Sequence, residues 1–162
     1  MRAFAVLVAL GHATLIAACA HSPRASPVEV AIEKAIIRDS GGEARGEVAA
    51  YAAFINHGTE TLIVDAWCEC SDTLELHVMV GEGADRRMTN VWPLVLPAGS
   101  RTEIVPGSPR HMMAVGITGP IAVGETRRIR FQLADGSWIA ADFVAVPNSA
   151  DAWRAFEVQT AN

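Results

Sequence analysis

The segment 126–146, TRRIRFQLADGSWIAADFVAV, carries the clearest structural signal in this chain. Over Thr126 to Leu133, apolar residues alternate with arginine and glutamine, which is the two-residue period of a strand with one buried face. Asp135 and Gly136 form a hairpin turn signal. Trp138 to Val146 then supplies the partner strand. This stretch therefore predicts an antiparallel β-hairpin.

Similar strand-like segments precede this hairpin at short intervals, separated by Gly, Pro, Asp and Ser residues that favour chain reversals. About eight or nine short strands with this spacing are typical of a β-sandwich or barrel. We therefore expect an all-β, antiparallel domain over residues 28–146, although the alanines of 47–56 also permit a helix. A C-terminal tail follows over 147–162, either irregular or with one short helix. The predicted strands are 28–38, 47–56, 61–67, 73–80, 94–96, 102–105, 111–117, 126–133 and 138–146.

Residues 1–18 have the features of an export signal, with a positive charge at Arg2 followed by a short apolar region. They end in Ile-Ala-Ala-Cys, which resembles a bacterial lipobox and implies cleavage before Cys19 and lipid attachment to it. Residues 19–27 would then form a lipidated tether. The alternative is an ordinary secretory signal cut close to Cys19. Either interpretation places the domain outside the cytoplasm, and the first holds it on the periplasmic side of a membrane.

Composition excludes several functions. The chain has 162 residues, enough for one domain, and a formal net charge of -5. Its basic residues form no stripe, which argues against nucleic-acid binding. The sequence contains no G-x-S-x-G or H-E-x-x-H motif and no paired carboxylates beside a plausible cleft. We therefore expect a binding protein and not an enzyme.

Histidine and methionine concentrate between residues 74 and 117. Thioether sulfur selects Cu(I) and imidazole binds copper readily, whereas the oxygen ligands that magnesium or calcium needs are missing here. Side chains at positions i and i+2 of a strand share a face, so His77 should project with Met79, and His111 with Met113. Met88 would reach the same place from a loop, and Met112 should point into the core. The residues concerned are His77, Met79, Met88, His111, Met112 and Met113.

Cys68 and Cys70 form a C-x-C pair outside this cluster. In an oxidising compartment, two cysteines usually indicate a disulfide, but a bridge across one residue lies near the permitted Cα separation. They could instead bind a second copper ion or exchange thiols with a partner. The sequence leaves these alternatives open.

The spacing of these residues resembles the PCu(A)C family of periplasmic copper chaperones. The signature of that family is His, ten residues, Met, twenty-one residues, then His-x-Met. Ten residues separate His77 from Met88, and His111 and Met113 form the His-x-Met. Met88 and His111 are separated by twenty-two residues, one more than the signature, and we place the extra residue in the loop 107–110. The likeness also includes the segments AAYAAFIN, LELH, LPAG and RIRFQL.

The resemblance implies a cupredoxin-like β-sandwich that binds Cu(I) through His77, Met88, His111 and Met113. Met79, Cys68 and Cys70 are additional candidates. It also implies a metallochaperone that delivers copper to a cuproprotein, namely the binuclear copper centre of cytochrome c oxidase subunit II.

The sequence is also compatible with three alternatives to delivery. The first is an envelope lipoprotein that sequesters copper for tolerance without a dedicated recipient. The second is a structural lipoprotein whose histidines and methionines belong to the core. The third is an electron-transfer cupredoxin, which needs a cysteine ligand, and no cysteine lies near His111 in the sequence.

Overall fold

The computed structural model describes residues 29–147 and residue 154. This part of the chain is built from ten strands and one 3-10 turn, which confirms the predicted all-β class. Among the described residues, no helix is long and apolar enough to cross a bilayer. The predicted leader (1–18), tether (19–27) and most of the tail (147–162) lie outside the described residues. The elements are β1 Val30–Arg38, β2 Glu47–Asn56, β3 Thr61–Cys68, β4 Ser71–Val80, η1 Gly83–Asp85, β5 Arg87–Asn90, β6 Leu94–Leu96, β7 Arg101–Ile104, β8 Arg110–Ile117, β9 Thr126–Leu133 and β10 Trp138–Val146.

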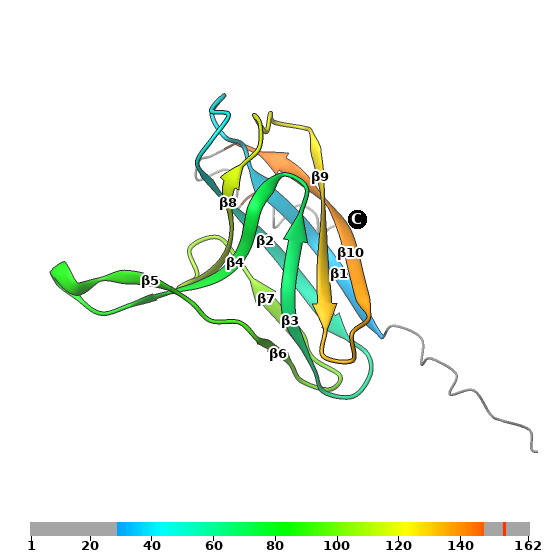
Figure 1. Cartoon of the computed structure of the whole chain (residues 1–162). Helices are drawn as coiled ribbons and strands as arrows, with labels where there is room; N and C mark the ends of the chain where they lie inside the picture. The colour runs from blue at the N-terminus through cyan, green and yellow to red at the C-terminus, as the bar shows by residue number, and fades with distance from the viewer. Residues whose placement is uncertain (1–28, 148–153, 155–162) are drawn as a thin grey trace, which may run out of the picture.

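The strands hydrogen-bond in the order β5-β4-β8-β2-β1-β10-β9-β3-β6, and β7 pairs with β2. This path folds back on itself as a sandwich, so that β3 and β9 lie over β1 and β2 (Figure 1). The two layers join at β1, which pairs antiparallel with β2 and parallel with β10. The expectation of a purely antiparallel sandwich is therefore wrong at this one pairing. β1 has a register shift between Glu33 and Ile36, with Lys34 at a φ of 52°. Such a bulge bends a strand, and the part of β1 after it pairs with β10 of the other layer.

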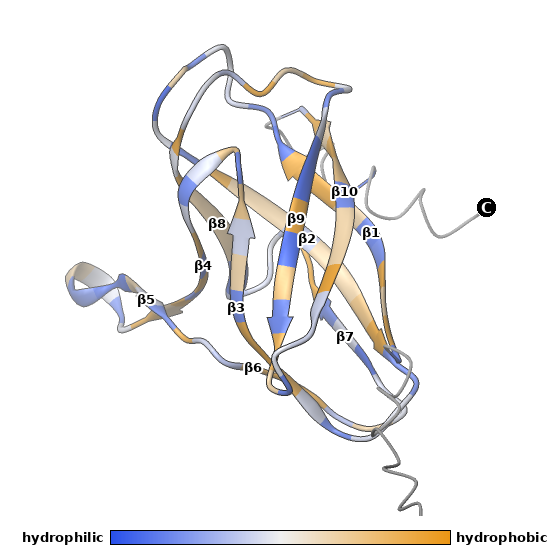
Figure 2. Cartoon of the chain, turned by 45° about the vertical axis from the view of Figure 1, so that its right-hand side comes forward, coloured by the Kyte–Doolittle hydropathy of each residue, from blue (hydrophilic) through white to orange (hydrophobic). Residues whose placement is uncertain are grey.

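The core between the layers is aromatic. The ring of Phe54 on β2 meets that of Phe131 on β9 edge to face at a centroid distance of 5.1 Å, and Phe143 on β10 lies beyond it. On β9 the buried Ile129, Phe131 and Leu133 alternate with more polar positions, as the sequence predicts. Figure 2 shows this alternation along β9, whereas β2 is hydrophobic along most of its length. β2 is buried on both faces along most of its length.

Asn56 ties the end of β2 to two neighbouring loops. It is 2% exposed, and its Nδ2 atom donates to the carbonyl oxygens of Leu96 and Thr59, at 2.9 and 2.7 Å. Its Oδ1 atom accepts a hydrogen bond from the amide of Gly58. A buried amide side chain is stable only with such partners. Asn56 therefore fixes the corner where β2 gives way to β3 and where β6 ends.

The distal part of β4 and all of β5 form a hairpin that projects from the sandwich (Figure 1); we call residues 77–90 the β4–β5 arm. Every residue of β5 is exposed. The arm turns at Gly81, whose φ of 81° favours glycine. The expectation that Met88 lies in a loop is wrong, because Met88 belongs to β5. This strand has a single apolar residue among Arg87–Asn90, so no alternation in the sequence could reveal it.

Candidate metal centre

The register of β4 and β8 places two histidines opposite each other. His77 is the antiparallel partner of His111, and their ring centroids are 6.1 Å apart at an interplanar angle of 81°. Directly opposed residues project from the same face of a sheet. Their chain neighbours Leu76 and Met112, which are also paired, turn to the opposite face and are buried in the core. The two imidazoles therefore lie together on the outer face of this layer.

Met113 follows His111 by two positions and shares its face, as the strand period predicts. Its exposed fraction is 9%, whereas that of Met112 is 0%. Met112 therefore belongs to the core, as expected. Met113 lies opposite Glu75 and has β2 on its other side, where it pairs with Ala49.

Met88 reaches this face from the β4–β5 arm. It is paired with Met79 and is 47% exposed. Met88, His111 and Met113 line one hollow of about 310 Å³, which Tyr51 and Arg38 also border. His77 does not line this hollow but adjoins it through its ring contact with His111. The fold thus gathers His77, Met88, His111 and Met113 at the base of the arm, while Met79 does not line the hollow.

Glu75 is a residue of this site that sequence reasoning missed. Its Oε2 atom lies 2.7 Å from Nε2 of His77, and this hydrogen bond is the main reason that the pKa of Glu75 is lowered. The spacing Glu75-x-His77 on one strand face was the signal that could have found it. The Nδ1 atom of His77 is buried and has no hydrogen-bond partner within the described part of the chain. The Glu75 contact therefore leaves one imidazole nitrogen available to a ligand.

The surroundings of His111 favour its neutral form. Partial burial lowers the pKa of His111, and the nearby charges of His77 and Arg38 lower it further. A neutral imidazole is the form that binds metal ions. The position of His111 between these groups therefore suits a metal ligand.

The available donors restrict the metal. Across residues 29–147, no group of three or more His, Cys, Asp or Glu side chains could hold a metal ion. A metal site at the base of the arm must therefore include methionine sulfur. Two imidazoles with two thioethers suit a soft ion such as Cu(I) and do not suit magnesium or calcium.

Cys68 and Cys70 do not join this cluster. They are bonded to each other, with an S–S distance of 2.02 Å and Cα atoms 5.0 Å apart. They flank the turn between β3 and β4, whereas His77 lies near the distal end of β4. His77 follows Cys70 by seven positions along an extended strand, which corresponds to roughly 23 Å. The structure therefore does not bring these cysteines to the candidate metal centre.

The family model for LpqE-like lipoproteins matches residues 30–146, which is most of the chain. The chain belongs to the LpqE-like family. A relative in Leifsonia xyli subsp. xyli (strain CTCB07), named "Putative lipoprotein Lxx21020", is 30% identical over 136 residues. That alignment covers 82% of this chain and 80% of the relative.

Solved structures with a fold similar to that of this LpqE-like protein include PCuAC domains. The copper-bound PCuAC domain from PmoF2 has a TM-score of 0.59 at 18% identity, and the match covers 74% of this chain and 93% of that domain. The solution structure of apo-DR1885 from Deinococcus radiodurans has a TM-score of 0.57 at 21% identity, and the match covers 88% of this chain and 95% of that protein. These likenesses confirm the cupredoxin-like β-sandwich and the expected resemblance to PCu(A)C proteins.

Proposed function

We propose that this protein is a Cu(I)-binding metallochaperone that acts outside the cytoplasm and carries copper as its cargo. The proposed ligands are His77, Met88, His111 and Met113. The observation that carries the proposal is the register of β4 and β8, which pairs His77 with His111 on one face, next to the hollow that Met88 and Met113 line. The one-residue difference from the PCu(A)C spacing falls between Met88 and His111, a stretch that includes the loop before β8.

The geometry suits a carrier more than a permanent metal site. Thioethers are neutral ligands that exchange easily, so they can hold Cu(I) selectively without trapping it. Met113 is nearly buried, whereas Met88 is 47% exposed on the projecting arm. Met88 is therefore the ligand that a recipient could displace first. The remaining three ligands would then present the ion at the protein surface.

The relatives support a copper cargo and an anchored protein. One structure with the same fold is described as copper-bound, and the Leifsonia relative is named as a lipoprotein. We infer that Cys19 is lipidated and holds the domain on the periplasmic side of a membrane. Multiple acyl chains on one residue would make that anchor stable. The proposed recipient is the binuclear copper centre of cytochrome c oxidase subunit II.

Competitive Cu(I) titration under reducing conditions tests the site. The full-length chain, expressed with its own leader and purified in detergent, should bind one equivalent tightly. The double variant His111→Ala/Met113→Ala should lose this equivalent. His57→Ala is the matched control, because His57 is an exposed histidine in the turn after β2. Unchanged binding by the double variant would refute the proposed ligands.

A transfer assay tests delivery separately. The copper-loaded protein is mixed with the copper-free domain of subunit II, the two are separated, and the copper content of each is measured. Copper recovered on subunit II supports the chaperone. Copper retained by the loaded protein would contradict delivery and indicate an envelope protein that sequesters copper for tolerance.

A further inference from the structure

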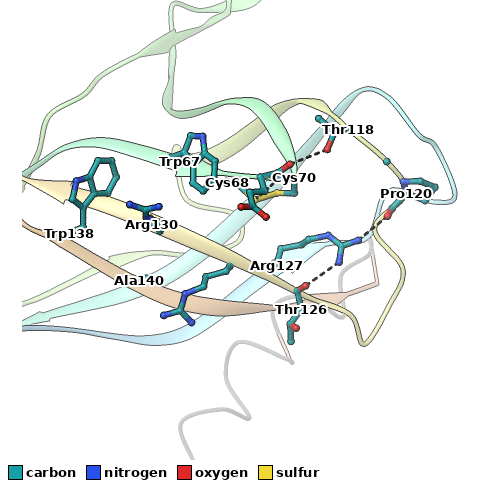
Figure 3. Close-up of a pocket in the computed structure, with 13 residues that line it drawn as sticks. Trp67, Cys68, Cys70, Thr118, Pro120, Thr126, Arg127, Arg130, Trp138 and Ala140 are labelled. Atoms are coloured by element: carbon teal, nitrogen blue, oxygen red, sulfur yellow. Dashed lines mark hydrogen bonds between the residues drawn. A yellow bond between two sulfur atoms is a disulfide. The ribbon is translucent and has the colours of Figure 1, made fainter.

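A groove lies on the outer face of β3, β9 and β10, in the layer opposite the β4–β8 pair. It has a volume of about 820 Å³ and extends from Trp138 past Arg130 and Trp67 to the Cys68–Cys70 disulfide (Figure 3). None of the proposed copper ligands lines this groove. The groove is therefore a feature that the copper function leaves unexplained.

The disulfide in this groove contributes little to holding the fold. It closes a loop with only Glu69 between the cysteines, and short loops constrain the unfolded chain least. The turn has other attachments, because the amide of Thr118 donates to the carbonyl oxygen of Cys70 at 3.0 Å. The hydroxyl of Thr118 also donates to the carbonyl oxygen of Glu69 at 3.1 Å. The turn should therefore keep its shape when the disulfide is reduced.

The backbone around the pair favours a thiolate at Cys68. The amide of Cys70 donates to the Sγ atom of Cys68 at 3.1 Å. The same donor would stabilise the negative charge on Cys68 after the disulfide opens, and a better-stabilised thiolate leaves faster. Cys70 is the more exposed of the two, at 7% against 2%. Attack is thus expected at Cys70, with Cys68 as the leaving group.

The groove beside the disulfide presents an arginine and two tryptophans, which are side chains that can bind an acidic peptide segment. Arg130 stacks between Trp67 and Trp138, with its guanidinium carbon 5.4 and 5.0 Å from the two ring centroids. Both tryptophans are about two-fifths exposed, at 41% and 40%. Within the described residues, Arg130 forms no ion pair with a carboxylate.

Two further arginines line the same groove, and each is paired with a carboxylate: Arg127 with Glu125 at 2.6 Å and Arg128 with Asp142 at 3.0 Å. Arg130, which forms no ion pair among the described residues, is therefore the positive charge that this groove offers to a partner. Exposed aromatic faces and arginine are the groups that carry most binding energy at protein interfaces. Arg130 between its two tryptophans therefore complements an acidic side chain of a partner.

We propose that Cys68 and Cys70 are a redox-active pair that exchanges thiol and disulfide with a partner protein, whose acidic, cysteine-bearing segment binds in this groove. A thiolate of the partner attacks Sγ of Cys70 and forms a mixed disulfide. Cys68 leaves with the electron pair and takes up a proton. A second thiolate of the partner then attacks the partner's own sulfur in the mixed disulfide and releases Cys70. The net step oxidises two partner thiols to a disulfide and reduces Cys68–Cys70 to two thiols, and the reverse step reduces a partner disulfide.

The test uses the full-length chain in detergent with two short reduced dithiol peptides, one flanked by aspartates and one by lysines. The fraction of reduced Cys68 and Cys70 is followed by alkylation and mass spectrometry, and circular dichroism monitors the fold. The aspartate peptide should reduce the pair roughly tenfold faster at low salt, because charge complementarity raises association rates. Arg130→Gln should remove much of this preference. Arg45→Gln, at an exposed position outside the groove, is the control and should preserve it.

Two results would overturn the proposal. A disulfide that resists both peptides while the chain stays folded would exclude exchange, and equal rates with the two peptides would exclude the acidic segment. The double variant Cys68→Ser/Cys70→Ser separates this proposal from the copper function, because it should still bind one equivalent of Cu(I). Loss of that equivalent would assign the cysteines to copper binding and refute an independent redox pair.

Discussion

The carboxylate of Glu75 lies 2.7 Å from Nε2 of His77, on the same face of β4. An ionised carboxylate accepts a hydrogen bond from Nε2–H, so this contact selects the tautomer in which Nδ1 carries the lone pair. That Nδ1 atom is buried and has no other partner among the described residues. The pair therefore resembles the carboxylate–histidine arrangement that orients metal ligands in many proteins.

Removing this carboxylate should weaken copper binding without removing a ligand. We expect Glu75→Ala to lower Cu(I) affinity about 10- to 100-fold. Glu75→Gln should lower it less, because the amide oxygen still accepts from Nε2. Competitive titration measures both. Glu60→Ala, an exposed carboxylate in the turn before β3, controls for general charge effects. Equal affinity of Glu75→Ala and the unmodified chain would show that His77 needs no such support.

Met88 and Met79 face each other across the arm but should differ in their effect on copper. Met88→Leu should weaken Cu(I) binding, because leucine fills similar space and offers no sulfur. Met79→Leu should leave the affinity nearly unchanged, since Met79 does not line the hollow. Because Met88 is 47% exposed, its replacement should alter the free energy of unfolding by less than about 0.5 kcal/mol. A larger loss with Met79→Leu than with Met88→Leu would reverse the assignment.

The sandwich could be predicted from the sequence because most of its strands have a recognisable pattern of alternating residues or are bounded by turn residues. Alternation along 126–133 and the turn residues at Asp135 and Gly136 are local signals, and the structure has strands on both sides of that turn. β5 gave no such signal, because its residues are all exposed and no buried face imposes a period. The parallel pairing of β1 with β10 also escaped prediction, because it depends on a bulge at Lys34 that brings together the two ends of the domain.

The sequence pattern identified the candidate ligands, but it did not predict how β4 and β8 align with each other. The strand period places His111 and Met113 on one face from sequence alone. That His77 lies opposite His111 depends on how β4 and β8 align, which no local pattern fixes. The hydrogen bond of Glu75 and the exposure of Met88 follow from that alignment and from the projection of the arm. The sequence also left the state of Cys68 and Cys70 open, and the structure shows a disulfide.

Acid should destabilise the copper-free protein partly through His111. Burial, together with the charges of His77 and Arg38, holds the pKa of His111 below its ordinary value of 6.5. The folded state therefore binds fewer protons than the unfolded state just below pH 6.5. The resulting stability is present above 6.5 and is lost as the pH falls toward the lowered value. Thermal unfolding should show a smaller loss of Tm on acidification for His111→Gln than for the unmodified chain. An identical pH dependence of the two proteins would contradict this role of His111.

Adjacent methionines on β8 should have separate roles in stability and copper binding. Met112 is fully buried, so Met112→Ala should cost about 2–5 kcal/mol of unfolding free energy through the cavity that it leaves. Met112→Leu and Met113→Leu both conserve volume and should each cost less than about 1.5 kcal/mol. Of these two conservative variants, only Met113→Leu should lose Cu(I) affinity, because Met113 shares the face of His111 and Met112 points into the core. Denaturant unfolding and competitive titration on the same samples measure the two effects. A fall in copper affinity for Met112→Leu equal to that for Met113→Leu would mean that β8 presents its ligands in another register.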